Sequence, residues 1–195
     1  MRMAGTLDTR IATVLAALAA AVVAALSLTG GAPDPAFAAG AKCQNANAGP
    51  RGTTSDKLGQ AVECLIAKQR KGANVKQLDP VGSLSGVADK HSDVMIKEDC
   101  LNHRCDGEKS LEKRIVRSGY PIPGGRYGFA EITGCSVTPK AMVEAWMRKR
   151  VFRKRILGRS YRDVGVGAAK GSPSVAGCDD GLRGVYTAIF AWRKP

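Results

Sequence analysis

The first part of the chain with a clear alternation of hydrophobic and polar positions begins near residue 55. Leu58, Val62, Leu65 and Ile66 recur at helical spacing, and lysine and arginine residues occupy the opposite face. This pattern predicts a first helix that is capped by Ser55 and ends near Gly72.

Two further helices follow a turn at residues 78–80. The second has an inner stripe at helical spacing, formed by Leu84, Val87, Ala88, His91, Met95 and, at its edge, Val94. We expect His91, which lies on this apolar face, to be a core histidine with a satisfied hydrogen bond, and not a partner of Ser92 in catalysis, because neighbours on a helix do not share a face. A short third helix is predicted over 110–118, followed by a loop at 121–125 with two prolines and two glycines.

The last third of the chain predicts one helix and two strands. Thr138 and Pro139 are typical of a helix start, and Met142, Val143 and Trp146 would line its buried face. Residues 163–169 alternate valine and glycine, and residues 184–192 (GVYTAIFAW) are apolar or small at nearly every position. A strand that is apolar on both faces must be covered on both sides, so we expect an α+β fold with the sheet between helices.

The glycines of the strand at 163–169 match a dinucleotide-binding motif only in part. Gly165 and Gly167 follow the spacing of a dinucleotide fingerprint, but Lys170 stands where its third glycine belongs. We interpret them as positions of close packing.

Residues 1–38 have the pattern of a secretory signal peptide. Arg2 and Arg10 precede 18 uncharged residues, and Ala36-Phe37-Ala38 supplies an A-x-A cleavage site. A membrane anchor is the alternative, but 18 moderately apolar residues barely span a bilayer. We therefore predict secretion after cleavage near Ala38, an N-terminal arm over 39–54, and one domain over 55–195.

Six cysteines lie beyond the predicted leader, an even number that indicates up to three disulfides in an exported chain. Fifteen complete pairings are possible. Cys100 and Cys105 are close enough for a local loop, and the remaining cysteines could pair in chain order as Cys43 with Cys64 and Cys135 with Cys178. A metal site formed by Cys100, His103 and Cys105 is the alternative for free thiols.

The net charge of +13 is concentrated in one segment. Eight cations and no acid occur in the 15 residues from 148 to 162: Arg148, Lys149, Arg150, Arg153, Lys154, Arg155, Arg159 and Arg162. We call these eight residues the basic segment. A solvated surface would explain one or two of them, but eight create a field that attracts polyanions. Phe152, Ile156 and Leu157 have the helical spacing to anchor the segment to the core.

The order and spacing of several segments resemble one family. These segments are CLIAKQRKG from Cys64, LDPVGSLSGVADKHSDVM, DCLNHRCDGEKSLEKRIVRSGY, YGFAEIT around Glu131, MVEAWMRKRVFRKRILGRSYRDVGVGAA and VYTAIFAW. Together they resemble the CAP superfamily (cysteine-rich secretory proteins, antigen 5 and pathogenesis-related class 1 proteins, also called SCP-like), in particular its bacterial extracellular branch. The resemblance implies an α-β-α sandwich.

The resemblance also implies a cavity in which two histidines and two glutamates can hold a divalent metal. By position, His103 and Glu131 correspond to the first of each. The second glutamate falls near Lys149, and the second histidine falls at Val185 or, by the bacterial Gly-His-Arg pattern, at Phe152. Two remaining residues are too few for a zinc site, which requires three or four protein ligands, so we expect no metal cofactor.

These observations favour a secreted binding module over an enzyme. The expected partner is an anionic envelope polymer, an acidic lipid or a polysaccharide, with nucleic acid as a further polyanion. One alternative is a hydrolase in which His103 and Glu131 form a proton-transfer pair. The other is a carrier of a lipid or small apolar ligand.

Overall fold

A four-stranded sheet forms the centre of the fold, in the order β1-β3-β4-β2. Strand β1 (Asp79–Pro80) is parallel to β3 (Asp163–Lys170). Strand β4 (Gly184–Lys194) is antiparallel to both β3 and β2 (Arg126–Ser136). The computed structural model describes residues 42–175, 177–178 and 181–195, so the predicted leader and the first residues of the predicted arm lie outside the described residues.

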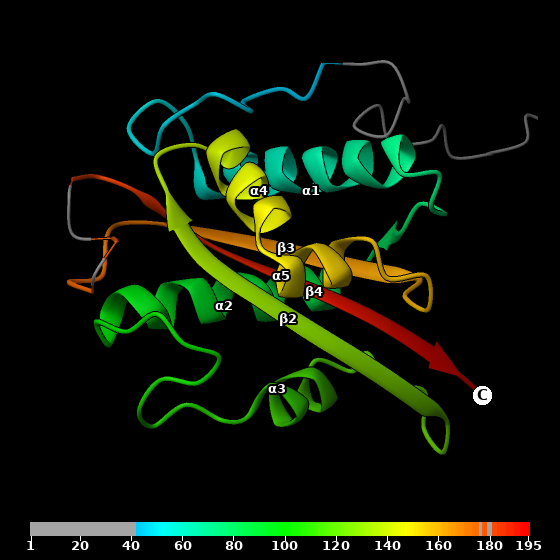
Figure 1. Cartoon of the computed structure of the whole chain (residues 1–195). Helices are drawn as coiled ribbons and strands as arrows, with labels where there is room; N and C mark the ends of the chain where they lie inside the picture. Colours follow the sequence, from blue (N-terminus) through cyan, green and yellow to red (C-terminus); the bar gives the residue numbers. More distant parts are fainter. Residues whose placement is uncertain (1–41, 176, 179–180) are drawn as a thin grey trace, which may run out of the picture. The chain divides into compact units, whose positions relative to one another are not determined.

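Helices cover both faces of this sheet (Figure 1). Helices α1 (Ser55–Gly72), α4 (Pro139–Arg148) and α5 (Arg150–Ile156) lie on one face. Helices α2 (Gly82–Lys97) and α3 (Leu111–Arg117) lie on the other. The expected α-β-α sandwich is confirmed. Within the described residues, no helix has both the length and the hydropathy needed to cross a bilayer.

The caps explain where the helices begin. Thr138 accepts a hydrogen bond from the Ala141 amide at 3.2 Å, and Pro139 follows it, as predicted. Helix α1 is capped by Thr54 and not by Ser55, because the Thr54 hydroxyl accepts from the Lys57 amide at 3.4 Å. The prediction was therefore one residue late.

Strand β4 separates two apolar layers. Its side chains at 186, 188 and 190 join the core beneath α1, α4 and α5, together with Trp146 and Ile156. Its side chains at 189 and 191 join Leu84, Ile115 and Tyr120 beneath α2 and α3. All eight residues from 184 to 191 are buried, which confirms the prediction of a strand covered on both faces.

Helix α2 lies directly on strand β3. A Cβ atom added to Gly165 would lie about 2.3 Å from the backbone of Leu84, and one added to Gly167 would lie about 2.1 Å from the backbone of Asp89. Real Cβ atoms do not approach backbone this closely. The two glycines thus allow helix and strand to touch without a layer of side chains between them.

Arg70 departs from the expected pattern of helix α1, because it is fully buried and does not lie on the exposed face. Its guanidinium donates to the carbonyls of Lys76, Ile156 and Gly158 at distances of 2.6 to 3.0 Å. Burial and the nearby Arg162 lower its pKa to about 10. Arg70 therefore joins the end of α1 to the end of α5 through backbone carbonyls.

Three disulfides join the chain in the order of its cysteines. They pair Cys43 with Cys64, Cys100 with Cys105 and Cys135 with Cys178, and among the described residues no cysteine is free. The first ties the segment before α1 to that helix. The second closes the loop after α2, which removes both thiols from any metal site there.

We expect Gly167→Ala to lower the free energy of unfolding by about 3 kcal/mol or more, because the methyl group would force α2 away from β3. Urea denaturation measures the change. Gly86→Ala on α2 is the matched control, since its Cβ meets nothing within 4 Å, and it should be neutral or stabilising by about 0.5–1 kcal/mol. Equal effects of the two substitutions would contradict the direct contact.

Candidate functional site

A buried carboxylate on strand β2 is the centre of the candidate site. Glu131 lies opposite Ile189 of β4, and its side chain is 1% exposed. Its oxygens face one cation and two imidazoles: Arg114 at 3.2 Å, His103 at 2.9 Å and His91 at 3.7 Å. A buried charge persists only with such partners.

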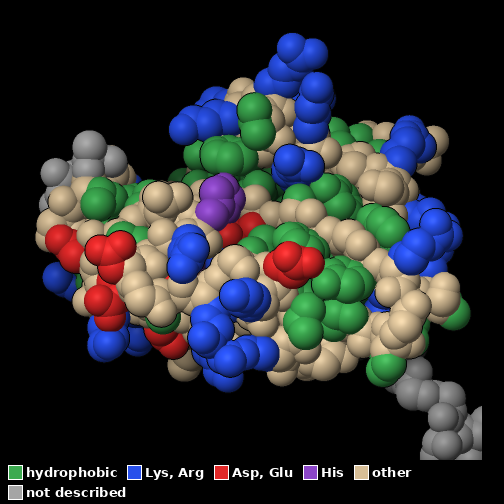
Figure 2. All heavy atoms as spheres, turned by 90° about the horizontal axis from the view of Figure 1, so that it is seen from below, with side chains coloured by type: hydrophobic (Ala, Val, Ile, Leu, Met, Phe, Trp, Pro, Cys, Tyr) green, Lys and Arg blue, Asp and Glu red, His purple; other side chains and the backbone are tan. Residues whose placement is uncertain are grey.

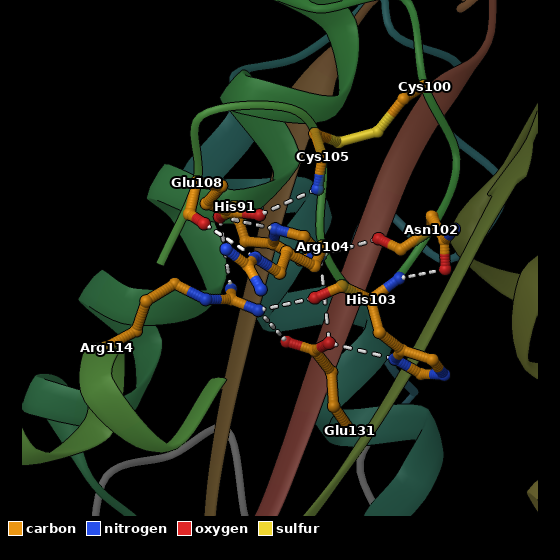
Figure 3. The surroundings of a disulfide bond; sticks show 9 residues. All are labelled: His91, Cys100, Asn102, His103, Arg104, Cys105, Glu108, Arg114 and Glu131. Carbon is orange, nitrogen blue, oxygen red and sulfur yellow. Dashed lines mark hydrogen bonds and ion pairs between the residues drawn. A yellow bond between two sulfur atoms is a disulfide. The ribbon is translucent and has the colours of Figure 1, made fainter. Parts of the chain in front are cut away.

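His103 and Glu131, the candidate pair from the sequence, are hydrogen bonded. The Nδ1 atom of His103 lies 2.9 Å from Oε1 of Glu131 (Figure 3). This bond is the main cause that raises the pKa of His103, partly opposed by burial and by the nearby Arg114 and Arg155. The side chain of His103 is 59% exposed, so the pair joins a buried carboxylate to the surface.

His91 forms a second pair beneath the first. It is fully buried, and its Nδ1 atom lies 2.8 Å from the carboxylate of Glu108. Its Nε2 atom lies 3.0 Å from the carbonyl of Asn102. Both partners are acceptors, so both bonds form together when each ring nitrogen carries a hydrogen. The prediction of a satisfied core histidine is confirmed.

Arg114 on helix α3 lies between the two carboxylates. Its Nη2 atom donates to Glu131 and, at 2.9 Å, to the carbonyl of His103. Its Nη1 atom lies 3.4 Å from Glu108. Glu108 and Arg114 were not predicted as site residues, because charges in a short amphipathic segment resemble a solvated helix face. The signal available in the sequence was that both residues lie within ten positions of Cys105, which closes the loop that carries His103.

The loop between α2 and α3 positions His103 through several contacts. The disulfide between Cys100 and Cys105 closes it, and the Cys105 amide donates to Glu108 at 3.2 Å. The side chain of Asn102 accepts from the amide of His103 at 2.8 Å. The loop therefore depends on the same buried charges that hold the histidine.

A cavity of about 440 Å³ lies beside His103. Its walls come from the loop, from strand β2 and from helices α4 and α5, and include Leu101, His103, Thr133, Met142, Trp146, Lys149 and Phe152. Cys135 and Cys178 also line it, but as a disulfide. The His103 ring can hold or pass a proton here, but the described lining offers no serine or free thiol as a nucleophile.

The structure distinguishes the two positions proposed for the family's second histidine. Phe152 lines the cavity, and so does Lys149, where the second glutamate was expected. Val185 is fully buried in the cluster that contains Met95 and Cys105, and it is not among the described residues that line the cavity. Phe152 therefore shares the cavity lining with His103, and Val185 does not.

The site does not fit a divalent metal. The Nδ1 atom of His103 is engaged by Glu131, and Lys149 brings an ammonium group to the cavity. Among the residues that the structure describes, no group of three histidine, cysteine, aspartate or glutamate side chains can hold a metal ion. The chemistry of this cavity comes from its cations.

All eight residues of the basic segment are exposed. They lie at the end of α4, along α5 and in the turn before β3. Within the described part of the chain, none of them forms an ion pair with a carboxylate. As predicted, Ile156 is buried and Phe152 and Leu157 pack against the core.

The comparisons with known proteins agree with this fold. The sequence model of the cysteine-rich secretory protein family matches residues 65–188. The chain belongs to this family, which is the CAP family. A comparison with curated proteins gave no match.

Three solved bacterial structures are similar to the chain. An outer surface protein of Borrelia burgdorferi is 17% identical, with a TM-score of 0.54 over 68% of this chain and 90% of that one. An extracellular SCP-domain protein of Bacillus anthracis is 20% identical, with a TM-score of 0.55 over 71% of this chain and 43% of that one. A cysteine-rich secretory protein of Staphylococcus aureus is 16% identical, with a TM-score of 0.52 over 71% and 39%. The chain thus spans less than half of the last two proteins, and these likenesses show the fold.

We expect Glu131→Gln to lower the free energy of unfolding by about 3 kcal/mol, because Arg114 would lose a buried counter-charge. The same substitution should lower the pKa of His103, measured by proton NMR. His103→Gln is the control and should cost less than about 1 kcal/mol, since the ring is largely exposed. A Glu131→Gln variant as stable as the wild type would contradict the buried network.

The His103 pair also predicts a pH dependence. Its raised pKa means that the pair stabilises the fold fully below the unfolded histidine pKa of about 6.5, and that this gain is lost as the pH rises through the folded value. The stability difference between wild type and His103→Gln should therefore shrink between about pH 5.5 and 9, by less than about 1 kcal/mol because solvent screens the pair. Urea denaturation at both pH values measures it, and a constant difference would contradict the coupling.

Proposed function

We propose that this protein is a secreted CAP-domain module without catalytic activity that binds an anionic polymer through its basic segment. The observation that carries the proposal is the set of eight exposed cations without a carboxylate partner in the described residues. Cations that lack acidic neighbours produce an electrostatic field that is not cancelled within the protein and that attracts an external anion.

Secretion is supported by the leader-like pattern of residues 1–38 and by the disulfides, which are typical of oxidising compartments. Two of the similar structures are an outer surface protein and an extracellular protein. We propose cleavage near Ala38, which mass spectrometry of the exported protein measures.

The arrangement of the basic segment favours a long ligand. The cations lie on two short helices and the turn that follows, and buried Ile156 fixes the segment to the core. Figure 2 shows Lys and Arg side chains on a projection, above hydrophobic side chains and a histidine. A polymer that carries repeated charges can contact several of these cations at once.

Export makes an envelope polymer, an acidic lipid or an extracellular polysaccharide the preferred class of partner over nucleic acid. We favour a polymer over an enzyme substrate because the described lining of the cavity beside the basic segment offers no serine hydroxyl or free thiol. Binding dominated by such charges should weaken steeply with salt.

Binding of the purified secreted chain to heparin, used as a sulfated polysaccharide probe, tests the proposal. If about five charges engage, the affinity should fall about 100-fold between about 50 and 200 mM salt. A triple variant, Arg150→Glu, Arg153→Glu and Lys154→Glu, should lose most of the affinity at low salt.

The matched control changes three exposed lysines elsewhere by the same charge: Lys57→Glu, Lys68→Glu and Lys109→Glu. This variant should keep most of the affinity if the basic segment is the site. Binding that is insensitive to salt, or an equal loss in both triple variants, would overturn the proposal. Double-stranded DNA binding more tightly than heparin at equal salt would instead favour nucleic acid.

A further inference from the structure

We propose that the cavity beside His103 binds a single oxyanion group, a phosphate, sulfate or carboxylate, between Lys149 and His103. The inference deepens the proposed function and rests on it, because the group would belong to the polymer that the basic segment binds. The proposed ligand is an anion, so its charge is opposite to that of a metal ion.

The charged side chains around the cavity favour an anionic ligand. Lys149 and His103 both line it, and its described lining contains no carboxylate. Glu131 is 1% exposed and is not among the described residues that line the cavity, so it does not present its charge there. Among the described lining residues, an anion entering this space would meet two cation-forming side chains and no acid.

The orientation of His103 leaves one of its ring nitrogens available to a ligand. Glu131 holds its Nδ1 atom, and the other ring nitrogen points away from Glu131 in Figure 3. The protonated ring could therefore donate from Nε2 to a ligand while Nδ1 stays bonded to Glu131. The raised pKa of His103 favours this protonated form.

Several charged groups surround His103 and determine how it responds to pH. Glu131 comes from β2 and Arg114 from α3, and both contact the histidine directly. Arg155 of α5 lies close enough to lower its pKa, and Lys149 also lines the cavity. His91 and Glu108 form the buried pair beneath Glu131 and Arg114. A bound anion would offset the repulsion from Arg114 and Arg155.

Lys149 belongs both to the lining of the cavity and to the basic segment. Its ammonium lies 5.7 Å from the centre of the Phe152 ring, which also lines the cavity. The cavity therefore opens beside the cations of α5. A polymer that lies along the basic segment would place one of its charged groups at this opening.

Proton NMR of the secreted chain with sodium sulfate as the probe tests the inference. Sulfate keeps its charge throughout the titration range of histidine. The chain has two histidines, so the signal of His103 is the reporter and that of buried His91 is the internal reference. At about pH 6.5 and constant ionic strength set with chloride, sulfate should shift the His103 signal saturably. It should also raise the pKa of His103 and leave the His91 signal in place.

Two neutralising variants separate the cavity from the general field. Lys149→Gln should weaken the sulfate affinity about tenfold, the equivalent of one lost charged hydrogen bond. Lys154→Gln removes the same charge from α5 but lies outside the described cavity lining, so it should change the affinity less than about twofold. No saturable shift, a shift shared equally by His91, or equal effects of the two variants would overturn the inference.

The sulfate experiment and the heparin experiment can fail independently of each other. If heparin binds with steep salt dependence but sulfate leaves His103 unchanged, the basic segment is a polyanion site and the cavity is not an anion site. If sulfate binds at His103 but the triple charge reversal leaves heparin binding intact, the cavity assignment stands apart from the polymer.

Discussion

The contact between helix α2 and strand β3 is the constraint on which the site depends. Gly165 and Gly167 let the helix backbone rest on the strand, which fixes the helix close to the sheet. His91 then comes within 3.7 Å of Glu131 on β2, two strands away in the sheet order. A side chain on either glycine would separate the histidine from its carboxylate partners, so backbone packing determines the electrostatics of the site.

Most of the fold could be predicted from periodicity, because helices α1, α2 and α4 and the two long C-terminal strands each bury several regularly spaced apolar residues. Strand β2 was not predicted as a strand, and only the motif around Glu131 was recognised, since the edge position of β2 leaves several of its residues partly exposed. Glu108 and Arg114 could not be predicted as site residues, because charge patterns alone do not distinguish a solvated face from a buried network. Arg70 was placed on the wrong face for the same reason.

Two side chains of the cavity differ in charge and polarity from the metal ligands that the family resemblance implied. His103 and Glu131 keep their bonded geometry, but Lys149 and Phe152 provide an ammonium and an apolar ring beside them. The described lining of the cavity therefore combines cation-forming and apolar side chains, which does not suit a metal ion.

Arg70 has a consequence for how the surface meets its partner. By donating to Ile156 and Gly158, it fastens the end of α5, and with it the middle of the basic segment, to helix α1. The cations are therefore presented on a rigid scaffold and not on a flexible tail. A preorganised array loses little backbone entropy on association and favours polymers whose charge spacing matches its own. Removing one buried guanidinium could thus broaden selectivity without altering a single exposed charge.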